Sequence, residues 1–339
     1  MKRLVIFAIV CLPFMGFLKK SMTPPLKLSE YGFFKGVLKN QEPADHVIPY
    51  HLNTPLFSDF AEKLRFVRLP AGESVTYNDS SVFNFPVGTA LIKTFYFPVD
   101  FREPSKGRKL IETRVLLHEE SGWKAFPYIW NDAQTEAELD VAGETTTVSY
   151  TDLQGKKKTT PYVIPNMNQC KGCHNRQEKM MPIGPSAWQL NGRQDYGSGP
   201  INQLEYWQKL GMLKGVYGAI PKGVVWNDPS TGSLDERARI WLDINCAHCH
   251  RNDGPASSSG LHLGWQEKDK LKLGIEKTPV AAGRGSGNLR FGIVAGKPDE
   301  SILLFRIKST DPGIMMPELG RTQMQAEAVA LIREWISKM

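Results

Sequence analysis

Two pentapeptides hold the residues with the most specific chemistry in this chain. Residues 170–174 read Cys-Lys-Gly-Cys-His and residues 246–250 read Cys-Ala-His-Cys-His, so both are Cys-x-x-Cys-His, the attachment sequence of c-type haem. On a helical turn, the two cysteines project to one side and bond the haem vinyl groups, while the histidine presents its imidazole to the iron. We therefore predict two covalent haem c groups, with thioethers at Cys170, Cys173, Cys246 and Cys249 and proximal iron ligands at His174 and His250.

Paired cysteines also occur in structural zinc sites and in redox dithiols. A structural zinc site usually has about 15 to 20 residues between its Cys-x-x-Cys pairs, whereas 72 residues separate Cys173 from Cys246. A redox dithiol has no need of a histidine directly after its second cysteine. His248 occupies a variable position of the second motif, and we expect it to point away from the haem, at the surface or in support of a ligand.

The sixth ligand determines what each haem iron does. At the second site we predict Met316, which lies 66 residues after His250 and directly before a proline. A residue before proline is biased to an extended conformation, and the soft thioether suits haem iron. The structural alternative is a pair of core methionines at 315 and 316.

At the first site, Met181 follows His174 by only seven residues. Seven extended residues reach at most about 24 Å, so a loop from His174 has little slack to reach the other face of the haem. We name Met181 as a tentative ligand. The open alternatives are Met167, Met180, Met212, a distant histidine, and an open or water-bound position.

The elements that must position these motifs change character along the chain. Residues 22–160 read as an all-β domain because they contain several stretches rich in β-branched and aromatic residues. These stretches are Val82–Val99, Leu110–His118, Trp123–Trp130, Thr145–Tyr150 and Thr159–Ile164.

Beyond residue 165 the signals become helical and loop-rich. Ser233–Glu236 forms a capping box at the start of a predicted helix, and Thr322–Gln325 forms a second one before an apolar pattern with helical spacing. We predict an α+β chain in which an all-β domain precedes mainly α-helical cytochrome c-type modules. The expected units are a leader over 1–21, the β-rich domain over 22–160, a first haem module over 161–230 and a second over 231–339.

The N-terminus indicates export. Lys2 and Arg3 precede an uncharged, largely apolar run from Leu4 to Leu18, the arrangement of a secretory leader. Its cleavage site is poor, so an N-terminal anchor that associates with the inner membrane through residues 4–18 stays open. We expect a periplasmic or exported location.

Composition and charge narrow the function classes. With 41% hydrophobic and 23% charged residues, the 339-residue chain is neither disordered, collagen-like nor a coiled coil. Without the four basic residues at positions 2, 3, 19 and 20, 38 basic residues stand against 35 acidic ones, so a nucleic-acid partner is not supported.

Residues 233–339 resemble a class I cytochrome c domain, because the capped helix, the second haem motif, Met316-Pro317 and the last helix with Trp335 occur in its order. Residues 160–230 are similar to the first haem module of a family of exported two-haem cytochromes. Further fragments that resemble this family are Ile111–Arg114, Tyr128–Asn131, Pro182–Pro185 and Asn202–Leu204. The resemblance implies a haem c electron-transfer protein on the outer side of the inner membrane, with no substrate named.

The expected function is the relay of single electrons between redox protein partners. A histidine–methionine iron changes oxidation state without changing its ligands, and unequal ligands on the two haems would make the relay directional. Two alternatives are a dihaem enzyme with an open position on the first haem, peroxidase-like or associated with a dehydrogenase, and a redox-sensing docking module.

Overall fold

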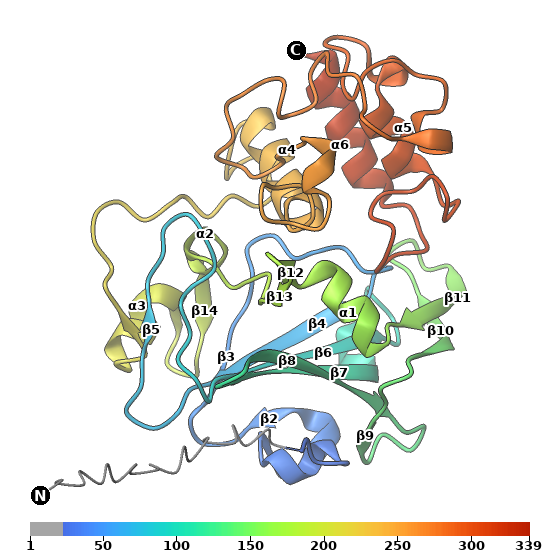
Figure 1. Ribbon diagram of the computed structural model, residues 1–339. Helices are drawn as coiled ribbons and strands as arrows, with labels where there is room; N and C mark the ends of the chain where they lie inside the picture. The colour runs from blue at the N-terminus through green and yellow to red at the C-terminus, as the bar shows by residue number, and fades with distance from the viewer. Residues whose placement is uncertain (1–22) are drawn as a thin grey trace, which may run out of the picture.

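The computed structural model describes residues 23–339, so the predicted leader and the membrane association through residues 4–18 lie outside the described range. The central element is a six-stranded antiparallel sheet (Figure 1). Its strand order is β3 (Val47–Pro49), β4 (Glu62–Arg68), β6 (Ala90–Pro98), β7 (Arg108–Glu119), β8 (Gly122–Trp130) and β9 (Ala137–Leu139). Between residues 23 and 339, no helix is long and apolar enough to cross a bilayer.

Five two-stranded sheets surround the central one. They are β1 (Phe34–Lys35) with β2 (Glu42–Pro43), β5 (Val75–Thr76) with β16 (Leu213–Lys214), β10 (Glu144–Thr151) with β11 (Lys157–Ile164), β12 (Asn175–Arg176) with β13 (Lys179–Met180), and β14 (Arg193–Asp195) with β15 (Pro200–Asn202). The α-helices are α1 (Met167–Cys173), α2 (Ala187–Leu190), α3 (Gln203–Lys209), α4 (Leu234–Leu242), α5 (Ile302–Lys308) and α6 (Ala326–Ser337).

The prediction of mainly α-helical modules after residue 160 is wrong. Regular structure in the described chain is mostly strand, and the longest of the six α-helices, α6, has 12 residues. Residues 161–230 contain five strands of two or three residues and three short helices. In residues 231–339, the long connection between α4 and α5 consists of turns and short 3₁₀ segments. The apolar positions there pack as loop side chains, without the sustained period that a helix needs.

The strand predictions agree better with the structure. β6 and β7 pair as the expected long hairpin, β8 follows β7, and β10 pairs with β11. The predicted first strand begins too early, because Val82–Thr89 precedes β6. The capping box at Ser233 is present, but Thr322 does not cap α6, which begins at Ala326 after Gln325.

The sheet carries different layers on its two faces (Figure 1). The N-terminal segment with β2 covers one face, where Leu28 and Phe33 join a core with Ile92 and Tyr128. Helix α1 and the β12–β13 hairpin cover the other face, and the C-terminal helices α4, α5 and α6 lie above them. The first haem motif therefore lies between the sheet and the C-terminal part of the chain.

Contacts between distant segments join the C-terminal part to the rest, and two of them involve α4 and the loop before α6. Ile240 and Ile244 share a core with Trp188 and Val224. The carboxylate of Asp59 accepts hydrogen bonds from the backbone N–H groups of Thr322 and Gln323 at 2.7 to 2.8 Å and from the Thr322 hydroxyl at 2.9 Å. Thr322 is thus held by the β-rich part, which explains why it does not cap α6.

Candidate haem sites

The first motif occupies the end of α1. Asn166 caps this helix by accepting a hydrogen bond from Gln169 N, and Gln169 bonds back to the backbone of Asn166. The backbone N–H of His174 donates to the carbonyl of Cys170 at 3.0 Å, so the motif forms one helical turn. Cys170 is buried, Cys173 is half-buried, and both are free thiols. The turn thus presents the two thiols and the histidine together.

His174 is oriented by the residue predicted to bind the opposite face of the haem. Its Nδ1 lies 3.0 Å from the carbonyl oxygen of Met181, and because a carbonyl only accepts, Nδ1 carries the proton. The Met181 N–H donates to the His174 carbonyl at 2.8 Å, which closes the turn around β12 and β13. Burial lowers the pKa of His174 to about 3. The imidazole is therefore neutral, with Nε2 left for a metal.

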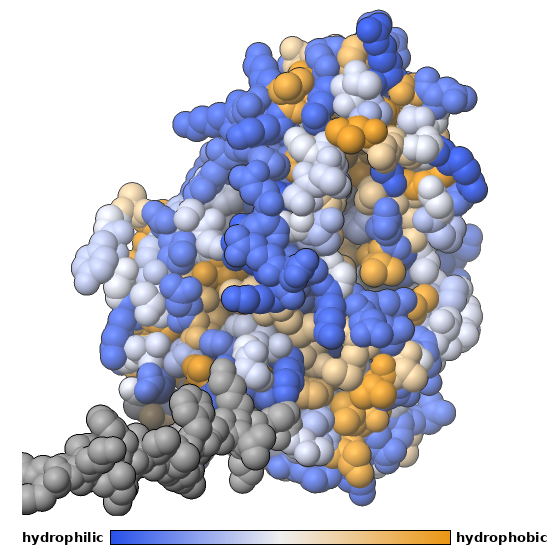
Figure 2. Space-filling view, viewed as in Figure 1, coloured by the Kyte–Doolittle hydropathy of each residue, from blue (hydrophilic) through white to orange (hydrophobic). Residues whose placement is uncertain are grey.

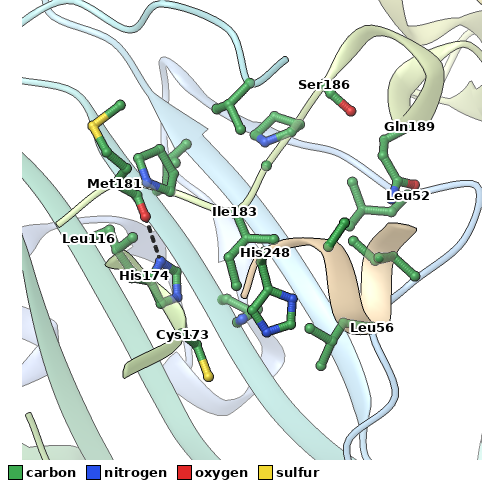
Figure 3. Close-up of a pocket in the computed structure, with 18 of the residues that line it drawn as sticks. Leu52, Leu56, Leu116, Cys173, His174, Met181, Ile183, Ser186, Gln189 and His248 are labelled. Atoms are coloured by element: carbon green, nitrogen blue, oxygen red, sulfur yellow. Dashed lines mark hydrogen bonds between the residues drawn. The ribbon is translucent and has the colours of Figure 1, made fainter. Parts of the chain in front are cut away.

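Met181 as the sixth ligand stays a prediction, and the structure shows that its backbone contacts His174. The Met181 carbonyl contacts Nδ1 of His174, and Met181 also lines the cavity of about 150 Å³ beside this motif. Its sulfur points away from the imidazole (Figure 3) and its side chain packs against the core beside the sheet. The short loop between residues 174 and 181 therefore supports the orientation of His174.

The second motif continues from α4. Ser233 caps the N-terminus of this helix. A π-helical turn over Asp243–Ala247 follows α4 and contains Cys246 near its C-terminal end. The backbone N–H of His250 donates to the Cys246 carbonyl at 2.9 Å, so this motif also forms one turn. π-Helical turns inside α-helices often occur at functional sites.

The ring of His250 has a defined tautomer as well. The Ser259 hydroxyl donates its proton to the Ala256 carbonyl at 2.7 Å, so it must accept from Nδ1 of His250 at 3.1 Å. Nε2 of His250 is again the nitrogen left for a metal. Burial lowers the pKa of His250 to about 4, which keeps the ring neutral.

A cavity of about 680 Å³ lies beside the second motif. This volume falls within the range of about 300 to 1,000 Å³ typical of ligand pockets. Cys246, Cys249, His250 and Met316 all line it, together with apolar side chains that include Leu263, Ile293 and Ile307. The visible face of the molecule is hollowed over the C-terminal part, and hydrophobic residues gather in that hollow (Figure 2). The donor set and the volume fit a haem.

The loop that carries Met316 is tightly held. The buried guanidinium of Arg321 donates to the Met316 carbonyl from Nε at 3.1 Å and from a terminal nitrogen at 2.8 Å. The Met316 N–H donates to the Arg306 carbonyl at 3.2 Å. Met316 lines the cavity, whereas Met315 is buried and is not part of the lining. Of the two methionines, the structure presents Met316 to the cavity.

A second cavity, of about 150 Å³, lies between the two motifs. His174 and Cys173 line it from the first motif, and Ala247 and His248 line it from the second (Figure 3). A porphyrin needs more room than this volume, so a haem at the first motif requires the two sides to move apart. The residues nevertheless supply a fitting donor set, because His174 is oriented with Nε2 free and the thiols share its turn.

The expectation for His248 is corrected by its burial. The side chain is not at the surface, because only 9% of the residue is exposed, and it lines both cavities. The backbone of Ile244 is its hydrogen-bonding neighbour, although no hydrogen bond of normal geometry reaches Nδ1. Burial lowers its pKa to about 4. The sequence shows only that His248 lies inside the second motif. The packing of the two motifs shows where its ring lies.

The sheet contributes a basic row that sequence reasoning missed. Arg65, Lys93 and Arg114 are directly opposite one another on β4, β6 and β7. Glu112 pairs with Arg114 at 2.5 Å, but neither Arg65 nor Lys93 has a carboxylate partner in residues 23–339, and both line the smaller cavity. Desolvation lowers the pKa of Lys93 to about 7, with Arg114 and Arg65 adding repulsion. Adjacent like charges destabilise a sheet unless an anion compensates.

Direct contacts hold the two motifs together. The N–H of Gln177 donates to the Asp253 carbonyl at 2.9 Å, and Arg176 Nε lies 3.2 Å from an Asp253 carboxylate oxygen. Cys173 from the first motif and Cys249 from the second both line the larger cavity. The two Cys-x-x-Cys-His turns, 72 residues apart in sequence, are therefore neighbours.

The thiols differ from those of a reactive redox dithiol. Burial raises the pKa of Cys246 and Cys249 to about 12, and it also raises the pKa values of Cys170 and Cys173. Reactive dithiols instead have lowered pKa values. Within the described residues, no group of three or more His, Cys, Asp or Glu side chains is placed to hold a metal ion.

The comparisons add no relative. No family model, no curated protein and no solved structure matches this chain.

Proposed function

We propose that this chain is an exported dihaem c-type cytochrome that relays single electrons between redox protein partners. The observation that carries the proposal is the adjacency of the two Cys-x-x-Cys-His turns, since Cys173 lines the cavity beside Cys246 and His250. Covalently attached haem iron supplies a one-electron couple between its ferrous and ferric states. The residues would hold two haem c groups through Cys170, Cys173, Cys246 and Cys249, with His174 and His250 on the irons.

The second site supports the relay most directly. His250 is fixed by Ser259, and Met316 is fixed by Arg321, so both side chains enter the cavity from restrained backbones. A one-electron site gains from such rigidity because little has to move when the charge changes. The cavity walls are mainly apolar, which lowers the local dielectric around the site. These features favour electron transfer over catalysis at this site.

The first experiment counts the haems. We would produce the full chain with a c-type cytochrome maturation system and measure covalent haem by intact mass and by the pyridine haemochrome spectrum. The wild-type protein should carry two haems, and the double variants Cys170→Ala/Cys173→Ala and Cys246→Ala/Cys249→Ala should each carry one. Cys11→Ala is the matched control and should retain two. A matured wild-type protein without covalent haem would overturn the proposal.

A redox titration with and without carbon monoxide then separates the relay from the enzyme. Two one-electron transitions that do not respond to the gas support the relay. If one haem binds carbon monoxide, an open iron is present, and the dihaem enzyme takes the place of the relay.

A further inference from the structure

One face of the central sheet carries an excess of positive charge. Lys93 on β6 is directly opposite Arg65 on β4 and Arg114 on β7, and side chains at opposed positions of adjacent strands share a face. Glu112 on the same face is already bound, because it accepts from Arg114 Nε at 2.7 Å and from the Tyr162 hydroxyl at 2.9 Å. Neither Arg65 nor Lys93 has a carboxylate partner in residues 23–339.

These two cations are held inside the protein with few contacts. Only 8% of Arg65 is exposed, and within the described chain its guanidinium makes only a long hydrogen bond of 3.5 Å, to the Lys63 carbonyl. The half-buried ammonium of Lys93 lies 4.9 Å from the centre of the Phe95 ring and donates no hydrogen bond to residues 23–339. Buried charges are normally paired, and like charges on adjacent strands repel each other. An anion between the two side chains would stabilise both.

Both cations line the smaller cavity, which has a volume of about 150 Å³. A water molecule takes about 30 Å³ of liquid, so this cavity has the volume of about five waters. That volume suits a small oxyanion at the size that the cavity has in the structure. Water alone would fill the space but would leave the charge of Arg65 and Lys93 uncompensated.

The opposite wall of the cavity supplies a neutral donor. His248 reaches the cavity from the turn that follows α4 (Figure 3). It is 9% exposed, and although the Ile244 backbone is a neighbour, no hydrogen bond of normal geometry reaches its Nδ1. A neutral imidazole carries one N–H group, which can donate to an oxygen atom in the cavity.

The remaining charged groups of the lining do not cancel the positive charge. Arg176 and Arg251 line the cavity, and both bind the carboxylate of Asp253. Asp243 is the one carboxylate in the lining among residues 23–339, and it accepts a hydrogen bond from the Trp265 N–H at 3.1 Å. Basic side chains therefore outnumber acidic ones around the cavity.

We propose that the smaller cavity binds a small oxyanion, of the size of phosphate, sulfate or acetate, between Arg65 and Lys93. The planar guanidinium would bind two oxygen atoms of the ion, and the ammonium would bind a third or share one of the two. The site needs no haem, so it goes beyond the proposed function. A haem at the first motif would bring carboxylates of its own in its propionate groups, and the test separates these two sources of anionic oxygen.

The test is the binding of inorganic phosphate, sulfate and acetate to the matured full-length chain, measured by isothermal titration calorimetry at constant ionic strength. Wild type should bind at least one of these anions at one saturable site per chain. Arg65→Met and Lys93→Met should each weaken this binding by about tenfold or more, because each removes a charged hydrogen-bond donor. Lys63→Met is the matched control and should bind as wild type does, because Lys63 bonds the Leu56 carbonyl and does not line the cavity.

Three results would overturn the inference. The first is the absence of saturable binding of all three anions. The second is binding in Arg65→Met and Lys93→Met that is as tight as in wild type. The third is binding by matured Cys170→Ala/Cys173→Ala but not by wild type, which would assign the two cations to the haem propionates.

The inference and the proposed function fail separately. A chain without covalent haem would overturn the proposed function, while anion binding by the same chain would still support the site. If Arg65→Met does not fold, Arg65→Lys keeps the charge but loses the planar fork and should weaken the binding. Unchanged binding in both Arg65→Lys and Lys93→Met would overturn the inference.

Discussion

Nδ1 of His174 lies 3.0 Å from the carbonyl oxygen of Met181, so the seven-residue connection positions the proximal histidine. A methionine at this spacing resembles a distal ligand in the sequence, but its backbone occupies the rear of the imidazole. The ring is thereby held in one tautomer, with Nε2 left free.

Removal of the Ser259 hydroxyl tests the orientation of His250. Ser259→Ala deletes the acceptor of the His250 Nδ1 proton, so it should destabilise the protein by about 1 kcal/mol and raise the potential of the second haem. The potential rises because an imidazole without this acceptor donates less electron density to the iron. Redox titration and chemical unfolding measure both effects. Ser257→Ala, at an exposed neighbour, should change neither, and a normal potential in Ser259→Ala would contradict the prediction.

Loss of Asp59 should loosen the loop that carries Met316. Asp59→Ala removes the acceptor of Thr322 and Gln323, next to the Arg321 that holds Met316. Hydrogen bonds to a charged group contribute about 1.5 to 3 kcal/mol, so we expect a loss of unfolding free energy of at least that size. The near-infrared band of histidine–methionine ligation should weaken. Asp45→Ala, an exposed carboxylate, is the control, and equal stability of the two variants would refute this role.

The basic row of Arg65, Lys93 and Arg114 should raise the reduction potential of a haem at the first motif. A positive charge favours the reduced iron, which carries one more electron, so Arg65→Met and Lys93→Met should each lower the potential of that haem. At an effective dielectric constant of about 20, one charge at about 10 Å contributes on the order of 1 kcal/mol. Lys63→Met is the matched control, because its ammonium bonds the Leu56 carbonyl and it does not line the cavity. A shift in Lys63→Met as large as in Lys93→Met would contradict this assignment.

The raised pKa of Asp243 leads us to expect that the free energy of unfolding depends on pH. Desolvation raises its pKa to about 6, although the N–H of Trp265 and the charges of Arg251 and Arg239 lower it. Because this folded-state pKa lies above the unfolded value of about 3.9, its contribution to stability is complete below about pH 4 and is lost as the pH rises through about 6. We expect a loss of about 2 kcal/mol after allowance for solvent screening.

Chemical unfolding between pH 4 and pH 8 measures this effect. Asp243→Asn keeps an oxygen for the Trp265 N–H but cannot ionise, so the loss of stability over this range should be smaller in the variant. The same dependence in wild type and variant would assign it to other groups.

Short-range features were predictable from the sequence. The strand pairs β6–β7 and β10–β11 and the cap at Ser233 follow from alternation, turn residues and a capping box, which act within a few residues. The same local reasoning failed after residue 160, where apolar side chains serve turns and loops packed on the sheet. It also failed at Thr322, because Asp59, 263 residues earlier, binds that residue.

The sequence by itself determined the two Cys-x-x-Cys-His turns, because a helical turn brings residues three and four apart to one side without help from the rest of the chain. Only the tertiary structure decided that these turns are neighbours and that His248 shares a cavity with His174. It alone showed that Arg65 and Lys93 lie beside that cavity without a carboxylate partner in residues 23–339. These relationships join residues that are far apart in sequence, and they depend on strand register and on the packing of three layers, which no local pattern encodes.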